Sequence, residues 1–163
     1  MNLIVAVDNQ WGIGIDNKLL FKIRDDLLYF KELTTSKVVI MGKNTLNSLP
    51  NGEPLKNRTN LILSSTLKRT DCEVFKNLDL LYARLNSFRE EDIFVIGGEI
   101  VYRTLLNKCK KAYVTKVYAN GNANKFFPNL DFEKCWELQS TSKTNFSDGY
   151  EFKFCQYINK SIN

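Results

Sequence analysis

The segment Ile93-Phe-Val-Ile-Gly-Gly-Glu-Ile-Val-Tyr102 is the strongest local feature of this chain. Its first four residues are apolar, as in a buried strand, and Gly97-Gly98 ends this run directly before a stretch with helical spacing. Two glycines allow a ligand to approach the backbone, and the new helix presents unpaired N–H groups and its positive dipole end. The segment lacks the full Gly-x-Gly-x-x-Gly fingerprint. It therefore predicts either an anion site, for example for a pyrophosphate, or an ordinary strand-to-helix turn.

Strand-type and helix-type segments alternate on both sides of this turn, which favours the α/β class with a mostly parallel sheet. The last strands follow one another through Asn145-Phe-Ser-Asp-Gly149, a segment suited to a hairpin, so we expect an antiparallel C-terminal edge. The expected eight strands are Asn2–Val7, Val38–Met41, Asn60–Ser64, Cys72–Phe75, Ile93–Ile96, Ala112–Tyr118, Cys135–Ser140 and Tyr150–Ile158. The expected four flanking helices are Asp25–Leu33, Lys43–Asn47, Leu78–Asn86 and Glu99–Leu106.

Length and composition predict one domain over residues 1–163. The chain has 163 residues, 44% of them hydrophobic, which is enough for a single core. Its apolar runs are far shorter than the ~20 residues that cross a bilayer. The start, Met1 to Asp8, lacks the basic region of a signal peptide and is typical of a first strand, so we expect a cytoplasmic protein without a membrane segment.

The residue inventory restricts the possible chemistry. The sequence contains no histidine, which removes Ser-His and Cys-His catalysis and His-dependent metal sites, and we expect no bound metal. Its four cysteines form no Cys-x-x-Cys pair, so we expect reduced thiols. We expect these cysteines and the two methionines to lie in the core. The net charge of +5 suits an anionic ligand, weak nucleic-acid binding or mere solubility. Because no Lys/Arg run exceeds two residues, we expect no nucleic-acid partner.

Two further predicted strands end in polar residues that could meet a phosphate. Gly42-Lys43-Asn44-Thr45 follows one strand and Ser64-Ser65-Thr66 another. In open α/β sheets, ligands bind beyond the carboxyl ends of parallel strands, so these ends predict a phosphate-bearing ligand. Lys43, Ser65, Lys68, Arg69 and Lys76 could meet an additional phosphate; alternatively, the last three only form a solvated face.

The predicted helix at Asp25–Leu33 carries a candidate acid. Helical spacing places Asp26 within the apolar stripe of Tyr29, Phe30 and Leu33. A buried carboxylate needs a partner, and desolvation should raise its pKa, which makes Asp26 a functional candidate; a capping role is the alternative. Asp25 is explained by the helix dipole or capping.

Two loops rich in Gly and Asn follow predicted strands. They are Asn9-Gln-Trp-Gly-Ile-Gly-Ile-Asp-Asn-Lys18 and Asn120-Gly-Asn-Ala-Asn-Lys125. Both are candidates for mobile lids, and Trp11 in the first of them is expected to be an apolar anchor.

The chain resembles dihydrofolate reductase from about Leu3 to about Tyr157, and the ordered set of segments makes the resemblance specific. The set comprises Ile4-Val-Ala-Val7, Trp11-Gly-Ile-Gly14, Leu19, Asp26-Leu27, Phe30-Lys31, Val39-Ile-Met-Gly42, Thr45, Leu55, Arg58, Leu63-Ser-Ser65, Val95-Ile-Gly-Gly98, Tyr102, Tyr113–Thr115 and Phe127-Pro128.

The resemblance implies a mixed eight-stranded sheet and a monomeric, NADPH-dependent enzyme that is an antifolate target. The implied reaction reduces 7,8-dihydrofolate to 5,6,7,8-tetrahydrofolate, by hydride transfer to C6 and protonation at N5, for one-carbon metabolism and nucleotide synthesis. The implied catalytic residues are Asp26, its hydroxyl partner Thr115, and Tyr102. The implied substrate-binding residues are Ile4, Val5, Leu27, Phe30, Lys31, Leu49, Leu55, Arg58 and Ile96. The implied cofactor-binding residues are Ala6, Ile13, Gly14, Leu19, Gly42, Lys43, Asn44, Thr45, Leu63, Ser64, Ser65, Lys76, Gly97, Gly98, Glu99, Ile100, Val101 and Tyr102.

Three positions depart from the family pattern. Leu20-Phe21 replaces the usual Pro-Trp, so the indole N–H that would orient a water near the substrate is missing. Lys43-Asn44 replaces Arg and a small polar residue, and an ammonium recognises phosphate less geometrically than a guanidinium. The carboxylate of Glu99 could compete with a pyrophosphate for the same amides, although acidic residues are common in a first helical turn.

Two alternative functions stay open. A related reductase could act on another heterocycle, as in riboflavin synthesis, but Asp26, Phe30 and Arg58 together favour a substrate with an amidine, a flat ring and an acidic tail. A noncatalytic nucleotide- or RNA-binding module would depend on the positive charge, yet interleaved aromatic and basic clusters are absent from the sequence.

Overall fold

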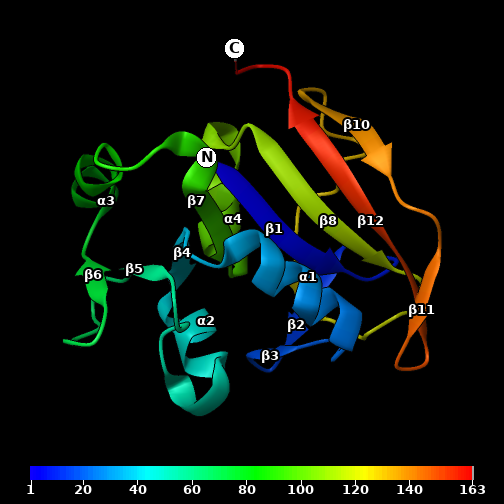
Figure 1. Cartoon of the computed structure of the whole chain (residues 1–163), viewed down its shortest axis with the longest axis horizontal. Helices are drawn as coiled ribbons and strands as arrows, with labels where there is room; N and C mark the ends of the chain where they lie inside the picture. The colour runs from blue at the N-terminus through cyan, green and yellow to red at the C-terminus, as the bar shows by residue number, and fades with distance from the viewer. Residues whose placement is uncertain (163) are drawn as a thin grey trace.

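A central β-sheet organises the chain in the computed structural model, which describes residues 1–162; Asn163, the last residue of the predicted domain, lies outside them (Figure 1). The strand order is β10-β12-β8-β1-β7-β4-β5-β6, and β11 pairs with β12 at the edge. The strands are β1 (Asn2–Val7), β4 (Val38–Gly42), β5 (Thr59–Leu63), β6 (Glu73–Phe75), β7 (Ile93–Gly97), β8 (Lys111–Val117), β10 (Trp136–Thr141), β11 (Asn145–Ser147) and β12 (Tyr150–Asn159). The predicted strands are confirmed, with shifts of at most one residue at their ends.

The sheet is mixed, as predicted. Strand β1 is parallel to β7 and β8, and β4 is parallel to β5 and β7, whereas β12 runs antiparallel to β8 and β10. The hairpin between β11 and β12 turns at Asp148-Gly149, where φ is 53° and 83°. Positive φ at both central residues is what a tight two-residue hairpin requires. This turn therefore produces the antiparallel edge.

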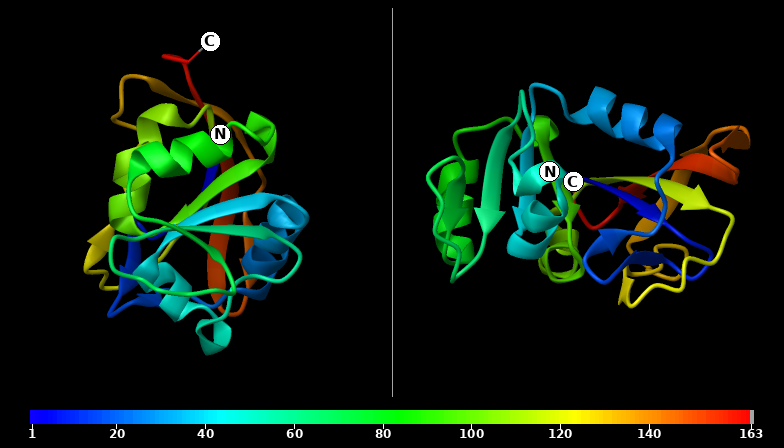
Figure 2. Two further views of the ribbon diagram at one scale, coloured as in Figure 1. Left: turned by 90° about the vertical axis from the view of Figure 1, so that its left-hand side faces the viewer. Right: turned by 90° about the horizontal axis from the view of Figure 1, so that it is seen from below.

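Within residues 1–162, four helices cover the two faces of this single α/β domain: α1 (Arg24–Thr34), α2 (Lys43–Ser48), α3 (Leu78–Leu85) and α4 (Glu99–Leu105). Alternate residues of β4 face opposite ways, because side chains alternate along a strand. Val38 and Ile40 join the core beneath α3 and α4, whereas Val39 and Met41 join a second cluster with Leu46 of α2. Figure 2 shows α1 and α4 on opposite sides of the sheet. Short 3-10 turns lie at Pro50–Gly52, Glu90–Asp92 and Leu106–Lys108.

The two predicted loops form a small second sheet that the sequence analysis missed. Its strands are β2 (Gly12–Ile15), β3 (Lys18–Leu19) and β9 (Lys125–Phe126), in the order β3-β2-β9. Gly14 pairs with Leu19 on one side and with Lys125 on the other. Strands of two to four residues show little periodicity, and the β2–β9 pairing joins distant parts of the chain. Local sequence therefore could not reveal it.

The cysteine prediction is partly wrong. Cys109 and Cys155 are buried and Cys72 is half-buried, but Cys135 is exposed, because it lies just before the edge strand β10. All four thiols are free. Among residues 1–162, no helix is both long and apolar enough to cross a membrane.

Candidate active site

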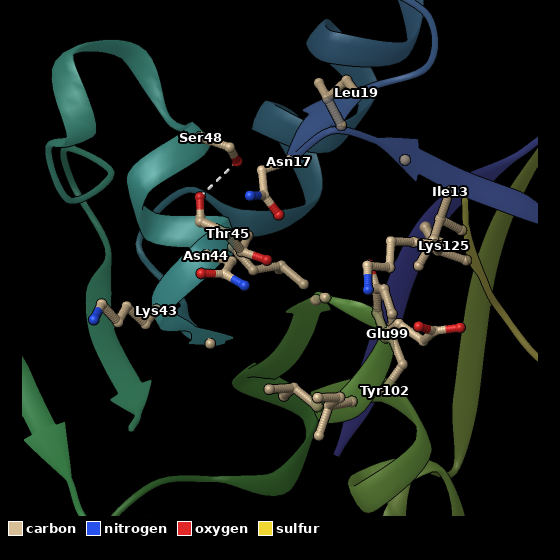
Figure 3. Close-up of a pocket in the computed structure, with 18 of the residues that line it drawn as sticks. Ile13, Asn17, Leu19, Lys43, Asn44, Thr45, Ser48, Glu99, Tyr102 and Lys125 are labelled. Carbon is tan, nitrogen blue, oxygen red and sulfur yellow. Dashed lines mark hydrogen bonds between the residues drawn. The ribbon is translucent and has the colours of Figure 1, made fainter. Parts of the chain in front are cut away.

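A cavity of about 430 Å³ opens where β1, β4, β5 and β7 end (Figure 3). The turns that follow β4 and β7 meet here, and their glycines allow the two turns to approach each other closely. A Cβ atom on Gly98 would lie 3.3 Å from Oγ1 of Thr45, and one on Gly42 would lie 3.2 Å from Val101. The lining residues are Val5, Ala6, Ile13, Gly14, Asn17, Lys18, Leu19, Gly42, Lys43, Asn44, Thr45, Ser48, Leu63, Ile96, Gly97, Gly98, Glu99, Ile100, Val101, Tyr102 and Lys125.

The cavity offers both backbone donors and apolar surface to a ligand. Helix α4 begins at Glu99, and the N–H of Tyr102 is bonded to the carbonyl of Gly98 at 2.9 Å, so the N–H groups before it lie in the orphan first turn. Leu19 and Ile100 are 65% and 78% exposed, although both side chains are large and apolar. Exposed apolar side chains gathered in a cavity indicate a binding site. The donor set suits a phosphate, and the apolar walls suit a flat ring.

The structure brings most of the predicted cofactor-binding residues together in one cavity. Every predicted cofactor-binding residue lines it except Ser64, Ser65 and Lys76. Lys76 instead lines a second cavity, beyond β5, together with Leu67, Lys68, Arg69, Thr70 and Val74. The hydroxyl of Ser64 is already engaged in hydrogen bonds with its own loop, because it accepts the N–H groups of Thr66 at 3.3 Å and Leu67 at 3.1 Å.

Arg69, a candidate phosphate ligand, is engaged within the protein. Its guanidinium donates to the carboxylate of Asp71 and, at 2.6 Å, to the carbonyl of Gly52. The hydrogen bond to Asp71 raises the pKa of Arg69 and lowers that of Asp71. Arg69 thus connects the Pro50–Gly52 turn to the loop after β5.

The carboxylate of Glu99 accepts a backbone N–H from β9, not one of the amides at the start of α4. Its Oε1 atom accepts the backbone N–H of Phe126 at 3.1 Å and lies 3.9 Å from the guanidinium of Arg103. The carboxylate therefore ties the start of α4 to β9. Its charge remains at the cavity, while its hydrogen-bonding capacity is partly used by Phe126.

Four lining residues were not predicted: Asn17, Lys18, Ser48 and Lys125. Asn17 and Lys18 lie at the end of the first Gly-rich loop and Lys125 ends the second, so the loop signal was the available clue. Figure 3 shows the Lys125 ammonium directed into the cavity near Glu99, whereas Lys43 extends away from its centre. Lys125 reaches this place because β9 pairs with β2 at Gly14, which carries no side chain.

The candidate acid lies on the α1 face of the sheet. The hydroxyl of Thr115, on β8, donates to Oδ1 of Asp26 at 2.6 Å. Burial raises the pKa of Asp26 above its usual value, and the hydrogen bond from Thr115 opposes this effect. Asp26 makes no capping hydrogen bond at the α1 terminus, so the capping alternative is excluded. Asp148 of the β11–β12 turn instead accepts the N–H of Arg24 at 2.7 Å.

Two tyrosines whose pKa values are raised, mainly by burial and in part by the charge of Asp26, keep their protons at neutral pH. Burial is the main cause that raises the pKa of Tyr29 to about 12, and Tyr29 packs on Phe154 with a ring separation of 4.1 Å. Burial also raises the pKa of Tyr102, whose hydroxyl donates to the carbonyl of Ile4 at 2.7 Å. Tyr102 therefore joins α4 to β1 and forms part of the cavity wall.

The predicted substrate residues divide between two regions. Leu49, Leu55 and Ile96 pack together on the cluster beneath α2, and Leu27, Phe30 and Lys31 lie on α1. Val5 belongs to the core on the α4 side, so only its backbone can face α1. Phe21 of the departure Leu20-Phe21 packs on Tyr150, with ring centroids 4.9 Å apart, and offers no polar hydrogen.

Arg58 is held by a residue that the sequence analysis did not single out. Its Nε and Nη2 atoms donate to the hydroxyl oxygen of Thr34, at 3.3 Å and 3.1 Å, and Nη1 donates to the carbonyl of Lys56 at 2.7 Å. Thr34 is fully buried and donates to the carbonyl of Phe30 at 2.8 Å. Partial burial lowers the pKa of Arg58, but a guanidinium stays charged at neutral pH. The end of α1 thus orients a cation.

Comparison with known proteins shows which family this chain is similar to. The family model described as dihydrofolate reductase matches residues 1–159. Dihydrofolate reductase of Schistosoma mansoni is 32% identical over 176 aligned residues, covering 96% of this chain and 95% of the relative. The enzyme of Haemophilus influenzae is 35% identical over 139 residues, covering 85% and 84%. Among solved structures, dihydrofolate reductase from Enterococcus faecalis, complexed with NADP(H) and RAB-propyl, superposes with a TM-score of 0.85 at 27% identity, covering 97% of this chain and 95% of that one.

The Asp26–Thr115 pair generates a prediction about proton affinity. Thr115→Val keeps the side-chain volume but removes the donor that stabilises the ionised carboxylate, so the pKa of Asp26 should rise further. Carbon-13 NMR titration of the Asp26 carboxyl measures this shift. Ser140→Val, an exposed change on β10, is the matched control and should leave the titration unaltered. An unchanged or lowered Asp26 pKa in Thr115→Val would contradict the assigned hydrogen bond.

Proposed function

The chain belongs to the dihydrofolate reductase family and is an NADPH-dependent oxidoreductase that reduces dihydrofolate, and we propose that it transfers hydride to C6 and a proton to N5, yielding 5,6,7,8-tetrahydrofolate. The observation that carries the proposal is the half-buried Asp26 carboxyl, bonded to Thr115, on the sheet face beside the cavity. A raised pKa suits a group that handles a proton near neutral pH.

The residues that line the cavity fit the cofactor. Ala6, Ile13, Gly14 and Leu19 would surround the nicotinamide, and the α4 terminus with Gly42 and Thr45 would hold the pyrophosphate. When bound, NADPH supplies the hydride. Figure 3 shows Asn44 and Lys125 facing the same space, where an amide and an ammonium can meet ribose and phosphate oxygens. Tyr102 contributes by packing and by fixing β1 against α4.

The α1 face would hold the substrate. The amidine of the pterin would meet the carboxylate of Asp26, since a carboxylate accepts two parallel N–H bonds. Phe30, Leu27, Leu49 and Leu55 would form the apolar walls around the ring and the benzoyl group. The guanidinium of Arg58, oriented by Thr34, would bind the folate α-carboxylate, and Lys31 would assist at the glutamate tail.

Proton delivery must operate without an indole donor at position 21. Asp26 with a bound water is the acid system that we propose, because Phe21 offers no hydrogen bond and the tyrosines keep their protons. Holding the nicotinamide against the pterin ring would supply much of the rate through orientation. The Asn9–Lys18 loop would exclude bulk water from the reacting atoms.

We further propose a monomeric, cytoplasmic enzyme that supports one-carbon metabolism and nucleotide synthesis and is a target of antifolates. A single chain brings residues of the β4 and β7 turns and of both Gly-rich loops together around one cavity, which suits a monomeric enzyme. Four free cysteines suit a reducing compartment.

Loss of nicotinamide absorbance on mixing the protein with NADPH and dihydrofolate tests the activity directly. We expect turnover with NADPH, and slower turnover with NADH if Lys43 recognises the 2′-phosphate. Binding of NADPH without reduction of dihydrofolate would contradict the proposed substrate and favour another heterocycle.

Asp26→Asn should reduce turnover about 10²- to 10⁴-fold at neutral and higher pH, the usual contribution of a general acid. The loss should shrink at low pH, where solvent protonates the substrate. Steady-state rates across pH measure this. Asp25→Asn is the control, because Asp25 is exposed in the same first turn and should keep the wild-type profile. An equal loss at every pH would disprove proton supply by Asp26.

Arg58→Ala should raise KM for dihydrofolate and leave KM for a pterin without the glutamate tail nearly unchanged. The reason is that only the tailed substrate carries the carboxylate that Arg58 would bind. Thr34→Val should cause a smaller effect of the same kind, since it removes the acceptor that orients the guanidinium. Similar KM changes for both substrates would refute the carboxylate assignment.

A further inference from the structure

Asp8 is a buried carboxylate that the proposed chemistry does not use. It follows the last residue of β1 and is 4% exposed. Its Oδ1 atom accepts the backbone N–H groups of Gln10 at 2.8 Å and Gly12 at 2.7 Å, and its Oδ2 atom accepts that of Gly121 at 3.0 Å. No ion pair within residues 1–162 involves Asp8. Backbone amides alone therefore satisfy this buried charge.

The three amides belong to two different loops. Gln10 and Gly12 lie in the Asn9–Lys18 loop, whereas Gly121 lies in the 120–125 loop, more than a hundred residues later. The loops pack tightly where they meet Asp8: a Cβ atom on Gly12 would lie 2.4 Å from Cβ of Ala123 and 3.0 Å from both Asp8 oxygens. Hydrogen bonds to an ionised acceptor are stronger than neutral ones. One side chain thus bridges both loops at their origin.

Both loops contribute wall residues to the cofactor cavity. Ile13, Gly14 and Lys18 come from the first loop and Lys125 from the second. Beyond Asp8, the loops stay joined through the β2–β9 pairing and the bond from the Asn124 N–H to the carbonyl of Gly14 at 3.0 Å. The cavity wall that these two loops form, at the proposed nicotinamide end, is therefore anchored at Asp8.

We propose that Asp8 is a positioning residue for hydride transfer, which sets the place of the Asn9–Lys18 loop at the nicotinamide end of the site without touching either ligand. The inference rests on the proposed function for its catalytic consequence. The bridge itself is a property of the ligand-free protein and can be tested separately.

Asp8→Asn isolates the bridge with little change in shape. A carboxamide has one acceptor oxygen and one NH₂ group. If the oxygen keeps the bonds to Gln10 and Gly12, the NH₂ group faces the N–H of Gly121, and two donors meet. In the reverse orientation, the bonds to the first loop are lost. Either way, the loops lose their common acceptor.

The matched control is Asn159→Ala at the opposite end of the sheet. Asn159 is 1% exposed, donates to the carbonyl of Cys109 at 3.1 Å and accepts the N–H of Ser161 at 3.0 Å. Its replacement also removes buried hydrogen bonds to the backbone, so it lowers stability without disturbing the loops. Asp8→Ser, which retains one acceptor oxygen, serves if Asp8→Asn does not fold.

The experiment compares two ligands. Asp8→Asn should weaken NADPH binding about tenfold, because the ligand must then order the loop without one of the charge-assisted hydrogen bonds that hold it in place. It should leave binding of adenosine 2′,5′-bisphosphate, which lacks the nicotinamide, unchanged. The value of kcat should fall, and amide hydrogen exchange at Gly121 should accelerate in the ligand-free protein. Asn159→Ala should change none of these quantities.

Equal weakening of both ligands in Asp8→Asn would show a merely structural role and overturn the proposal. Unchanged kcat and NADPH binding, or unchanged exchange at Gly121, would overturn it as well. If the wild-type protein binds NADPH but does not reduce dihydrofolate, the proposed substrate fails, whereas the exchange and binding comparisons still decide the role of Asp8.

Discussion

Strand β1 is the constraint on which the site depends. It pairs with β7 on one side and with β8 on the other, and its side chains are buried on both faces. Helix α4 follows β7 and Thr115 lies on β8, so the pairings of β1 set the distance between the glycine turn after β7 and the Asp26–Thr115 pair. The hydroxyl of Tyr102 adds a direct bond from α4 to Ile4 of this strand. The chain leaves β1 at Asp8, where both loops are anchored.

Charge is distributed unevenly between the α1 face of the sheet and the cavity at the strand ends. The α1 face holds one partly desolvated carboxyl, Asp26, with an uncharged partner, so this group keeps a raised proton affinity. On the cavity side, cations and backbone N–H groups predominate, although the carboxylate of Glu99 is also present. Asp26 does not line the cavity within the described residues, so its carboxyl is set apart from the cations found there.

Several candidate residues turned out to have structural tasks. Arg69 pairs with Asp71 and Gly52, Glu99 accepts from Phe126, and Phe21 packs on Tyr150. Residue type alone cannot distinguish these tasks from ligand binding, because a guanidinium or a carboxylate recognises a backbone group as readily as a substrate. The same limitation hid Thr34, whose burial beneath Arg58 is a consequence of how α1 packs.

Sequence patterns alone predict the alternation of strands and helices, the hairpin at Asp148-Gly149, the glycine turn after β7 and the placement of Asp26 on the apolar side of its helix. These features follow from periodicity and local backbone preferences, which act over a few residues. The family resemblance, and no local pattern, pointed to Thr115 as the partner of Asp26, and the structure confirms this hydrogen bond. Two contacts were visible in the folded protein alone: Lys125 enters the cavity, and Asp8 bridges two loops. Each of these contacts joins residues far apart in the chain, and its existence depends on strand order and packing, which no local pattern encodes.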